Sequence, residues 1–185
     1  MSVKAFVHQN SINAATALLV AVAVWRIGFS PELPAVVAFI FGGVLLAVID
    51  WKVQRLPTQI VYVTLAGVAA GLLFASLVEW EWVHLATAAA GAVLFANAFF
   101  LIWLVGRNFA GVMLIGFGDV RLAALLGLLL GWYGLPYVLY GAIAGHLLAL
   151  VVAVATCLRR RKLILRFSFG PTLIAGALAV VLFHA

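Results

Sequence analysis

Acidic residues are scarce in this chain. Only five Asp and Glu residues occur among its 185 residues, and charged residues of both signs make up 9% of it, against 68% hydrophobic residues. A soluble domain carries roughly 25% charged residues, and no polar stretch here is long enough to form one. The low charge and the mean hydropathy of +1.27 exclude an ordinary soluble protein and predict a chain embedded in a membrane.

Cysteine is nearly absent as well. The single cysteine, Cys157, excludes an internal disulfide and a metal site built on a Cys-x-x-Cys pair. No cluster of His, Cys and Glu ligands stands near the aspartates, so the sequence predicts neither a metal nor a cofactor. A cleavable signal peptide is also not evident, because the first apolar run lacks a small-residue cleavage site and further apolar runs follow it. We expect that run to stay as a membrane anchor.

Long apolar runs dominate what is present. There are seven, at residues 13–29, 34–51, 60–78, 83–105, 119–133, 135–157 and 170–184. A helix needs about 20 apolar residues to span a bilayer, and in lipid a helix satisfies its own backbone. The runs do not alternate apolar and polar residues as barrel strands do. The sequence therefore predicts an all-α, polytopic membrane protein with about seven transmembrane helices.

The basic residues sort to one side of these spans. If the N-terminus is cytoplasmic, ten of the eleven Lys and Arg residues fall in cytoplasmic segments, and only Arg26 falls outside. Cytoplasmic loops are enriched in Lys and Arg, so we expect a cytoplasmic N-terminus and an external C-terminus. Because the basic residues occupy short loops, the net charge of +6 indicates topology and contact with membrane lipids, and it does not indicate nucleic-acid binding.

This orientation places two aspartates on the cytoplasmic side. Asp50 ends the second apolar run and Asp119 begins the fifth, whereas the three glutamates fall outside. Ionisable groups at membrane depth are costly, so they are functional candidates. Two carboxylates that share a site can activate a water and protonate a carbonyl. Asp50 and Asp119 are therefore a candidate catalytic pair, and the alternative is that both are helix caps at the interface.

The residues around the aspartates support a site. Gly116, Phe117 and Gly118 precede Asp119, and glycines permit unusual backbone angles and close backbone approach. We predict that they form an active-site loop beside which a peptide can lie extended, and that the glycine-rich approach at 111–118 dips into the bilayer. Four further residues flank the aspartates, and we expect them to tune the pair through opposite charge, to form a substrate loop or to anchor the helices: Lys52, Arg55, Pro57 and Arg121.

Three segments together resemble the type IV prepilin peptidases. Residues 116–127 are similar to the GxGD region of that family, residues 50–57 to its first aspartate motif, and residues 167–171 to the Pro-Phe-Gly-Pro that opens its last helix. The family consists of aspartyl endopeptidases of the bacterial inner membrane, which remove basic leader peptides from prepilins and pseudopilins at the cytoplasmic face. The resemblance implies that Asp50 and Asp119 are the catalytic dyad and that a prepilin is the protein substrate.

Three residues depart from the family pattern. Arg121 stands where lysine is common, Thr58 where asparagine is common, and Ser168 where the last motif begins with proline; none replaces an aspartate. The chain also lacks the cysteine-containing insert of longer members, so it resembles the short Tad/Flp-type peptidases, and methyltransferase activity is not expected. The resemblance implies a peptidase core at 34–185, preceded at 1–33 by a tail and an extra transmembrane helix.

Two other functions share part of this pattern. Presenilin-type intramembrane proteases also carry GxGD, but they have a Tyr-Asp motif and a Pro-Ala-Leu motif, whereas here Ile49 precedes Asp50 and Pro-Ala-Leu does not occur. A small proton-coupled transporter that uses the aspartates as a relay is expected to have discontinuous helices in paired halves, and no such repeat is visible. The sequence fixes neither the pilin nor the oligomeric state.

Overall fold

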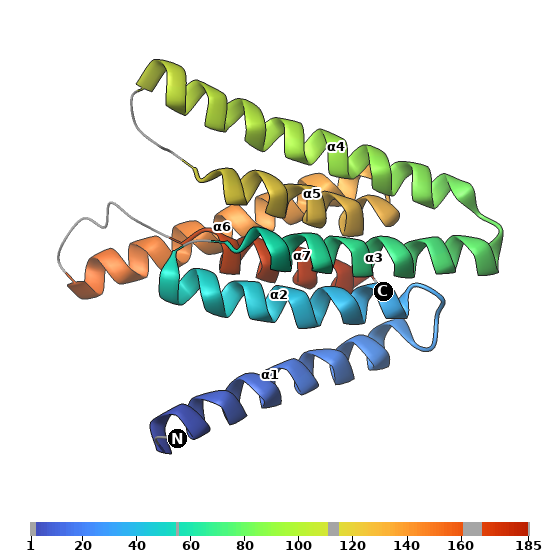
Figure 1. Ribbon diagram of the computed structural model, residues 1–185, viewed down its shortest axis with the longest axis horizontal. Helices are drawn as coiled ribbons and strands as arrows, with labels where there is room; N and C mark the ends of the chain where they lie inside the picture. Colours follow the sequence, from blue (N-terminus) through green and yellow to red (C-terminus); the bar gives the residue numbers. More distant parts are fainter. Residues whose placement is uncertain (1–2, 55, 111–114, 161–167, 185) are drawn as a thin grey trace.

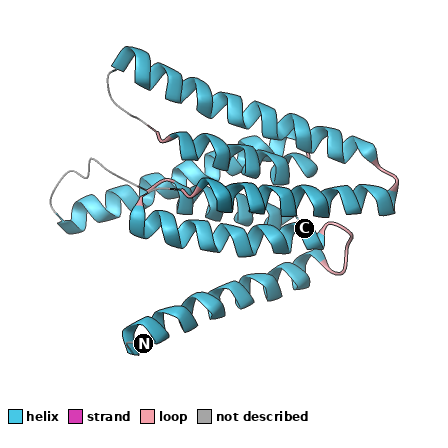
Figure 2. Cartoon of the chain, viewed as in Figure 1, coloured by secondary structure: helices cyan, strands magenta, loops and turns pink. Residues whose placement is uncertain are grey.

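Helices make up nearly all of the structure. The computed structural model describes residues 3–54, 56–110, 115–160 and 168–184, and within these ranges it contains no strand. The elements are α1 (Val3–Ile27), α2 (Leu33–Val53), α3 (Thr58–Glu79), α4 (Trp82–Val105), the π-helical turn η1 (Gly106–Ala110), α5 (Phe117–Trp132), α6 (Leu135–Arg160) and α7 (Gly170–His184). Figure 1 shows them as one bundle, and Figure 2 shows that helices account for most of the described residues. The all-α prediction is confirmed.

The lengths of the helices suit a membrane. Four are long and apolar enough to cross one, namely α2, α3, α6 and α4 extended into η1, while Ile12–Ile27 and α7 are shorter apolar helices. The expected boundaries agree with the observed ones to within three residues everywhere except at α1, which begins at Val3 instead of residue 13. The polytopic helical prediction is therefore confirmed, and the first helix extends beyond its apolar run.

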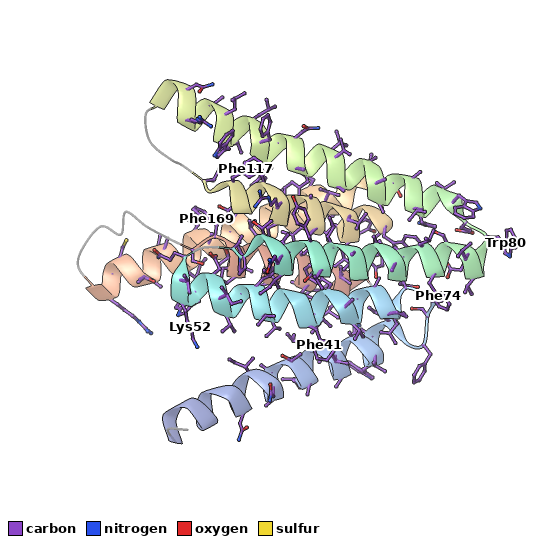
Figure 3. The ribbon with its side chains drawn as sticks, viewed as in Figure 1. Phe41, Lys52, Phe74, Trp80, Phe117 and Phe169 are labelled. Atoms are coloured by element: carbon purple, nitrogen blue, oxygen red, sulfur yellow. The ribbon has the colours of Figure 1, made fainter. Side chains whose placement is uncertain are left out.

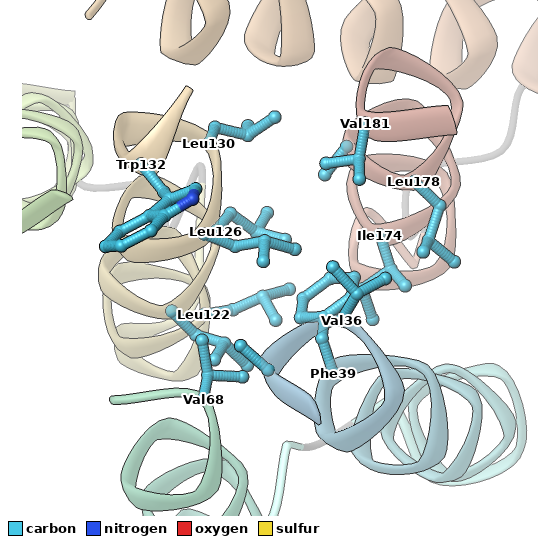
Figure 4. Packing of buried hydrophobic residues seen from close by; sticks show 14 of the residues in the cluster. Val36, Phe39, Val68, Leu122, Leu126, Leu130, Trp132, Ile174, Leu178 and Val181 are labelled. Carbon is cyan, nitrogen blue, oxygen red and sulfur yellow. The ribbon is translucent and has the colours of Figure 1, made fainter. Parts of the chain in front are cut away.

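The centre of the bundle is occupied by α5. Ten of its 16 residues are buried, and a helix that is apolar all round is typically enclosed by other helices. Figure 4 shows Leu122, Leu126 and Leu130 of α5 directed toward Ile174 of α7 and Phe39 of α2. Because α5 begins at the GxGD segment, the buried core fixes the position of Asp119.

Glycines let neighbouring helices approach closely. A Cβ atom at Gly127 of α5 would lie 2.3 Å from the carbonyl oxygen of Gly91 in α4, and one at Gly176 of α7 would lie 2.4 Å from the amide nitrogen of Gly145 in α6. Small residues play this role where membrane helices meet, because lipid gives no hydrophobic drive for helices to associate. The close packing of α4 against α5, and of α6 against α7, therefore requires glycine at these contacts.

The first helix is attached near its C-terminal end. Ala23 is fully buried, and Arg26 Nε donates a hydrogen bond of 2.8 Å to the carbonyl oxygen of Leu182 in the last turn of α7. Cations are favourable at helix C-termini, where carbonyl groups lack partners. Toward its N-terminus α1 diverges from α2 (Figure 1). Arg26, the basic residue that was expected on the external side, therefore links α1 to α7 by a hydrogen bond.

The two ends of the helical bundle carry different residues. One, called the aspartate end, is marked by Asp50, Thr58 and Asp119. The other, called the far end, is marked by Arg26 and Trp132. In Figure 3, Lys52, Phe117 and Phe169 lie at the aspartate end and Trp80 lies at the opposite one.

Candidate active site

The packing of α2 turns Asp50 into the bundle. The buried residues of this helix recur every three or four positions and include Leu46 and Asp50, one turn apart. Residues spaced in this way share one face of a helix, so the face that packs against the core also carries the carboxylate. Asp50 is 6% exposed, although it lies in the last turn of α2.

The start of α7 holds the Asp50 carboxylate. The Ser168 hydroxyl donates a hydrogen bond to Asp50 Oδ2, and the Gly170 amide donates to the same oxygen at 3.1 Å. The first amides of a helix have no partner within the helix, and negative charge is favourable there. Asp50 therefore caps α7 across 120 residues of sequence.

Gly170 has a steric reason to be glycine. A Cβ atom at this position would lie 2.6 Å from Asp50 Oδ2, so any side chain here would force the carboxylate to move. The sequence motif at 167–171 marks the start of the last helix, but the sequence did not indicate that Ser168 and Gly170 contact Asp50. Residue 167 of this motif lies outside the described ranges.

Asp119 is held by its own helix. It is the third residue of α5, after the N-cap Gly116, and its Oδ2 accepts a hydrogen bond of 3.0 Å from the Gly116 amide. In return the Asp119 amide donates to the Gly116 carbonyl oxygen at 3.0 Å. A carboxylate in the first turn commonly satisfies an N-cap amide in this way. Both aspartates thus serve helix N-termini, and capping and catalysis are compatible at this end.

The two carboxylates lie at the same end of the bundle and are not joined by a direct hydrogen bond. Within the described ranges, their hydrogen bonds go to other groups. Each carboxylate accepts these hydrogen bonds through its Oδ2 atom. In the described residues no group of three or more His, Cys, Asp or Glu side chains is arranged to hold a metal ion.

Arg121 connects the start of α5 to α3. Its Nη1 donates a hydrogen bond to Thr58 Oγ1, and its guanidinium lies 4.8 Å from the ring centre of Phe117 and 5.8 Å from that of Tyr62. Nε is buried and has no hydrogen-bond partner among the described residues. Two departures from the family pattern, Arg121 and Thr58, therefore bind each other.

The GxGD segment has neighbours in α4 and in the loop between α2 and α3, although Gly116 and Phe117 are exposed. The Phe117 ring meets the edge of Trp103 in α4 at 5.3 Å. On the other side, a Cβ atom at Gly118 would lie 3.0 Å from Leu56 Cβ in the loop between α2 and α3. The residues before Asp119 therefore contact both α4, through Phe117, and the loop that follows Asp50, through Gly118. The predicted dip of the approach at 111–118 falls mainly on 111–114, which lie outside the described residues.

The remaining predicted site residues take different places. Lys52 is exposed, and it forms no ion pair within the described ranges. Pro57 is the N-cap of α3, and its carbonyl oxygen accepts the Val61 amide at 3.2 Å, so its observed role is to begin a helix. Arg55 lies outside the described residues.

Comparison with known proteins gives a family match that covers both aspartates and ends before α7. Residues 35–154 match the type IV leader peptidase family. A Pseudomonas putida protein named prepilin leader peptidase/N-methyltransferase is 33% identical over 171 residues, which cover 92% of this chain and 57% of that protein. A Burkholderia pseudomallei protein of the same name is 35% identical over 161 residues, which cover 84% of this chain and 48% of that protein.

A third relative is covered more fully. The Escherichia coli protein of that name is 29% identical over 182 residues, covering 95% of this chain and 75% of that protein. The chain spans about half the length of the first two relatives. No solved structure matches it significantly. With a family match over most of its length, the chain belongs to the type IV leader peptidase family.

Proposed function

We propose that this protein is an integral-membrane aspartyl endopeptidase that cleaves basic leader peptides from prepilins or pseudopilins. The observation that carries the proposal is the location of Asp50 and Asp119 at the same end of the bundle, where Oδ2 of each is bound to protein donors. The substrate class comes from the family, since several relatives are named prepilin leader peptidase.

The reaction needs only the two carboxylates and a water. An ionised carboxylate takes a proton from the water, whose oxygen attacks the scissile carbonyl carbon, while the protonated carboxyl gives its proton to the carbonyl oxygen. In the second step the C–N bond breaks, the leaving amine takes the proton held by the first carboxyl, and the second carboxyl regains its own. Both aspartates return to their starting states, and no cofactor enters.

The charges favour a reaction at the cytoplasmic face of the inner membrane. Lys52, Arg107 and Arg121 lie on segments of the aspartate end, and positive residues mark the cytoplasmic side of membrane proteins. Glu79 and Glu81 lie at the opposite ends of their helices. In this orientation the N-terminus is cytoplasmic and the C-terminus external. A substrate then enters sideways, with its apolar stem in the lipid and its leader in the cytoplasm.

We also propose a division of the chain. Residues 34–185 form the peptidase core, and residues 1–33 supply an additional helix that α7 holds through Arg26. The proposal is restricted to peptidase activity, because the resemblance associates methyl transfer with paired cysteines and the chain has one cysteine.

Two amide variants test the function. The protein is co-expressed with a pilin precursor that carries a basic leader, and leader removal is followed by gel shift and mass spectrometry. Asp50→Asn and Asp119→Asn are each expected to reduce cleavage by about 100-fold or more, the scale on which general acid–base groups act. Glu79→Gln, which changes an exposed acid at the end of α3, is the matched control and is expected to cleave normally. Continued cleavage by either Asn variant, at equal protein level, would rule out the dyad.

A further inference from the structure

We propose that Ser168 is a positioning residue: with the Gly170 amide it fixes Oδ2 of Asp50, so that Oδ1 is the oxygen that meets the reacting water. This inference rests on the proposed peptidase function. Ser168 itself touches neither substrate nor water in this scheme. It acts through Asp50, and so its removal is expected to change the rate of reaction more than the binding of substrate.

The first support is that two donors converge on one oxygen. The Ser168 hydroxyl and the Gly170 amide both bind Asp50 Oδ2, and they come from either side of Phe169 at the start of α7. A carboxylate held by two donors at one oxygen cannot rotate about its terminal bond without losing both hydrogen bonds. The orientation of the other oxygen, Oδ1, is thereby fixed as well.

The second support is the closeness of the α7 backbone. The ideal Cβ position at Gly170 is 2.6 Å from Oδ2 and 3.2 Å from Cγ of Asp50, so the carboxylate rests against bare backbone on this side. Asp50 is also 6% exposed. The side chain therefore has little room to turn, and the Ser168 hydroxyl helps to fix the orientation of the carboxylate, with one oxygen toward α7.

The third support is the contrast with Asp119. Its Oδ2 is held by one amide, that of Gly116, three residues away in the same helix start. Asp50 has in addition a side-chain donor from a segment 118 residues away. The Ser168 hydroxyl is therefore a side-chain donor to Asp50, of a kind that the Gly116 amide does not supply to Asp119.

The test measures kcat and KM separately for purified full-length protein in lipid vesicles, with a pilin precursor bearing a basic leader as substrate. Ser168→Ala is expected to lower kcat about tenfold, the lower end of what a lost hydrogen bond to a charged group predicts, with KM changed less than about twofold. Ser168→Thr keeps the hydroxyl and is expected to restore most of kcat. Gly170→Ala places a methyl group against Oδ2 and is expected to lower kcat further.

Thr172→Val is the matched control. Thr172 is also in the first turn of α7, but its hydroxyl donates to the Phe169 carbonyl oxygen and not to Asp50. The variant removes a hydroxyl at nearly constant shape and is expected to react like the unmodified protein. If Ser168→Ala retains full kcat, or loses no more than Thr172→Val, the positioning role is wrong.

The thermal midpoint separates the remaining outcomes. If the Ser168→Ala protein does not fold, Ser168→Thr and Gly170→Ala decide the question. A normal kcat of a folded Gly170→Ala protein overturns the proposal. A low kcat of the Gly170→Ala protein, together with an active Ser168→Thr protein, supports it. Failure of the proposed function looks different, because Asp50→Asn then remains active. An inactive Asp50→Asn protein with a fully active Ser168→Ala protein rejects the positioning role alone.

Discussion

The aspartate end and the far end of the bundle hold their charged groups by different chemistry. At the far end, Glu81 Oε2 lies 3.0 Å from His84 Nε2, and Arg26 binds the carbonyl oxygens of α7. At the aspartate end, Asp50 and Asp119 receive hydrogen bonds only from a hydroxyl and backbone amides within the described ranges. Neutral donors orient a carboxylate without cancelling its charge. The Glu81–His84 pair of the far end places a carboxylate beside a titratable ring, whereas the donors to Asp50 and Asp119 are neutral. On the proposed function, this difference leaves two carboxylates available for chemistry at the aspartate end.

The basic residues at the aspartate end follow the same rule. Arg121 binds Thr58 and lies over two aromatic rings, and Arg107 lies 5.2 Å from the Trp103 ring centre. Guanidinium groups stack well on aromatic faces. Both guanidinium groups thus contact aromatic side chains. That Lys52, Arg55 and Arg121 tune the aspartate pair through opposite charge stays a prediction.

The largest expected effect separates the two duties of Asp50. Asp50→Ala and Asp50→Asn are both expected to lose cleavage by about 100-fold or more. Only Asp50→Ala removes every acceptor for the start of α7, so it is expected to destabilise the fold by about 1 kcal/mol, as loss of a helix cap does. Leader cleavage and thermal unfolding in detergent measure the two effects. Equal stability of both variants would show that the cap contributes little.

A middle effect is expected at Arg121. Arg121→Ala removes one hydrogen bond and two ring contacts and is expected to destabilise the protein by about 2 kcal/mol, with lower cleavage because α5 is released from α3. Arg121→Lys keeps the charge but loses the planar fork, so its loss is expected to be about half as large. Arg107→Ala, which affects a contact with one ring, serves as the control. A stable, fully active Arg121→Ala protein contradicts the link.

A smaller effect is expected at Arg26. Arg26→Ala removes the hydrogen bond to the end of α7 and is expected to lower stability by about 1 kcal/mol. Because this contact lies at the far end, cleavage at moderate temperature is expected to stay within twofold of normal. Thermal melting and the cleavage assay measure both. A large loss of cleavage without a loss of stability would mean that the two ends are coupled.

The smallest effect is expected at the exposed pair of the far end. Glu81→Gln removes the charge opposite His84, and both side chains are substantially exposed, so the change is expected to be about 0.5 kcal/mol or less. Melting at low and at high salt checks this, since screening weakens such pairs. A salt-dependent loss several times larger would show that the pair is structural after all.

The sequence predicted the helices well because bilayer thickness fixes the length of an apolar run. It placed α7 at 170–184, as observed, but it began the first helix ten residues late. That helix continues through polar residues such as Gln9 and Asn10, which hydropathy alone does not recognise as helical. Successive spans cross the membrane in alternating directions, so the end of the second span and the start of the fifth were expected on the same side. The structure likewise has Asp50 and Asp119 at one end of the bundle.

The contacts of the site were harder to predict. The Ser168 hydroxyl and Asp50 are 118 residues apart, and Arg121 and Thr58 are 63 apart, so each contact depends on how the helices pack. A local motif shows that such residues are unusual, but it does not show what they touch. The departures at 58, 121 and 168 were therefore visible in the sequence as exceptions, and only the fold shows that they are contacts.

The bond between Asp50 and the start of α7 also has a consequence for the order of assembly. Asp50 is synthesised 120 residues before its amide partner Gly170, so its Oδ2 has no partner until the last helix has been made and inserted. We expect a chain whose last helix is not yet in place to hold one aspartate without its orientation. On the proposed function, the hydrolytic site would then be completed at the end of membrane insertion, after the other helices are already in the bilayer.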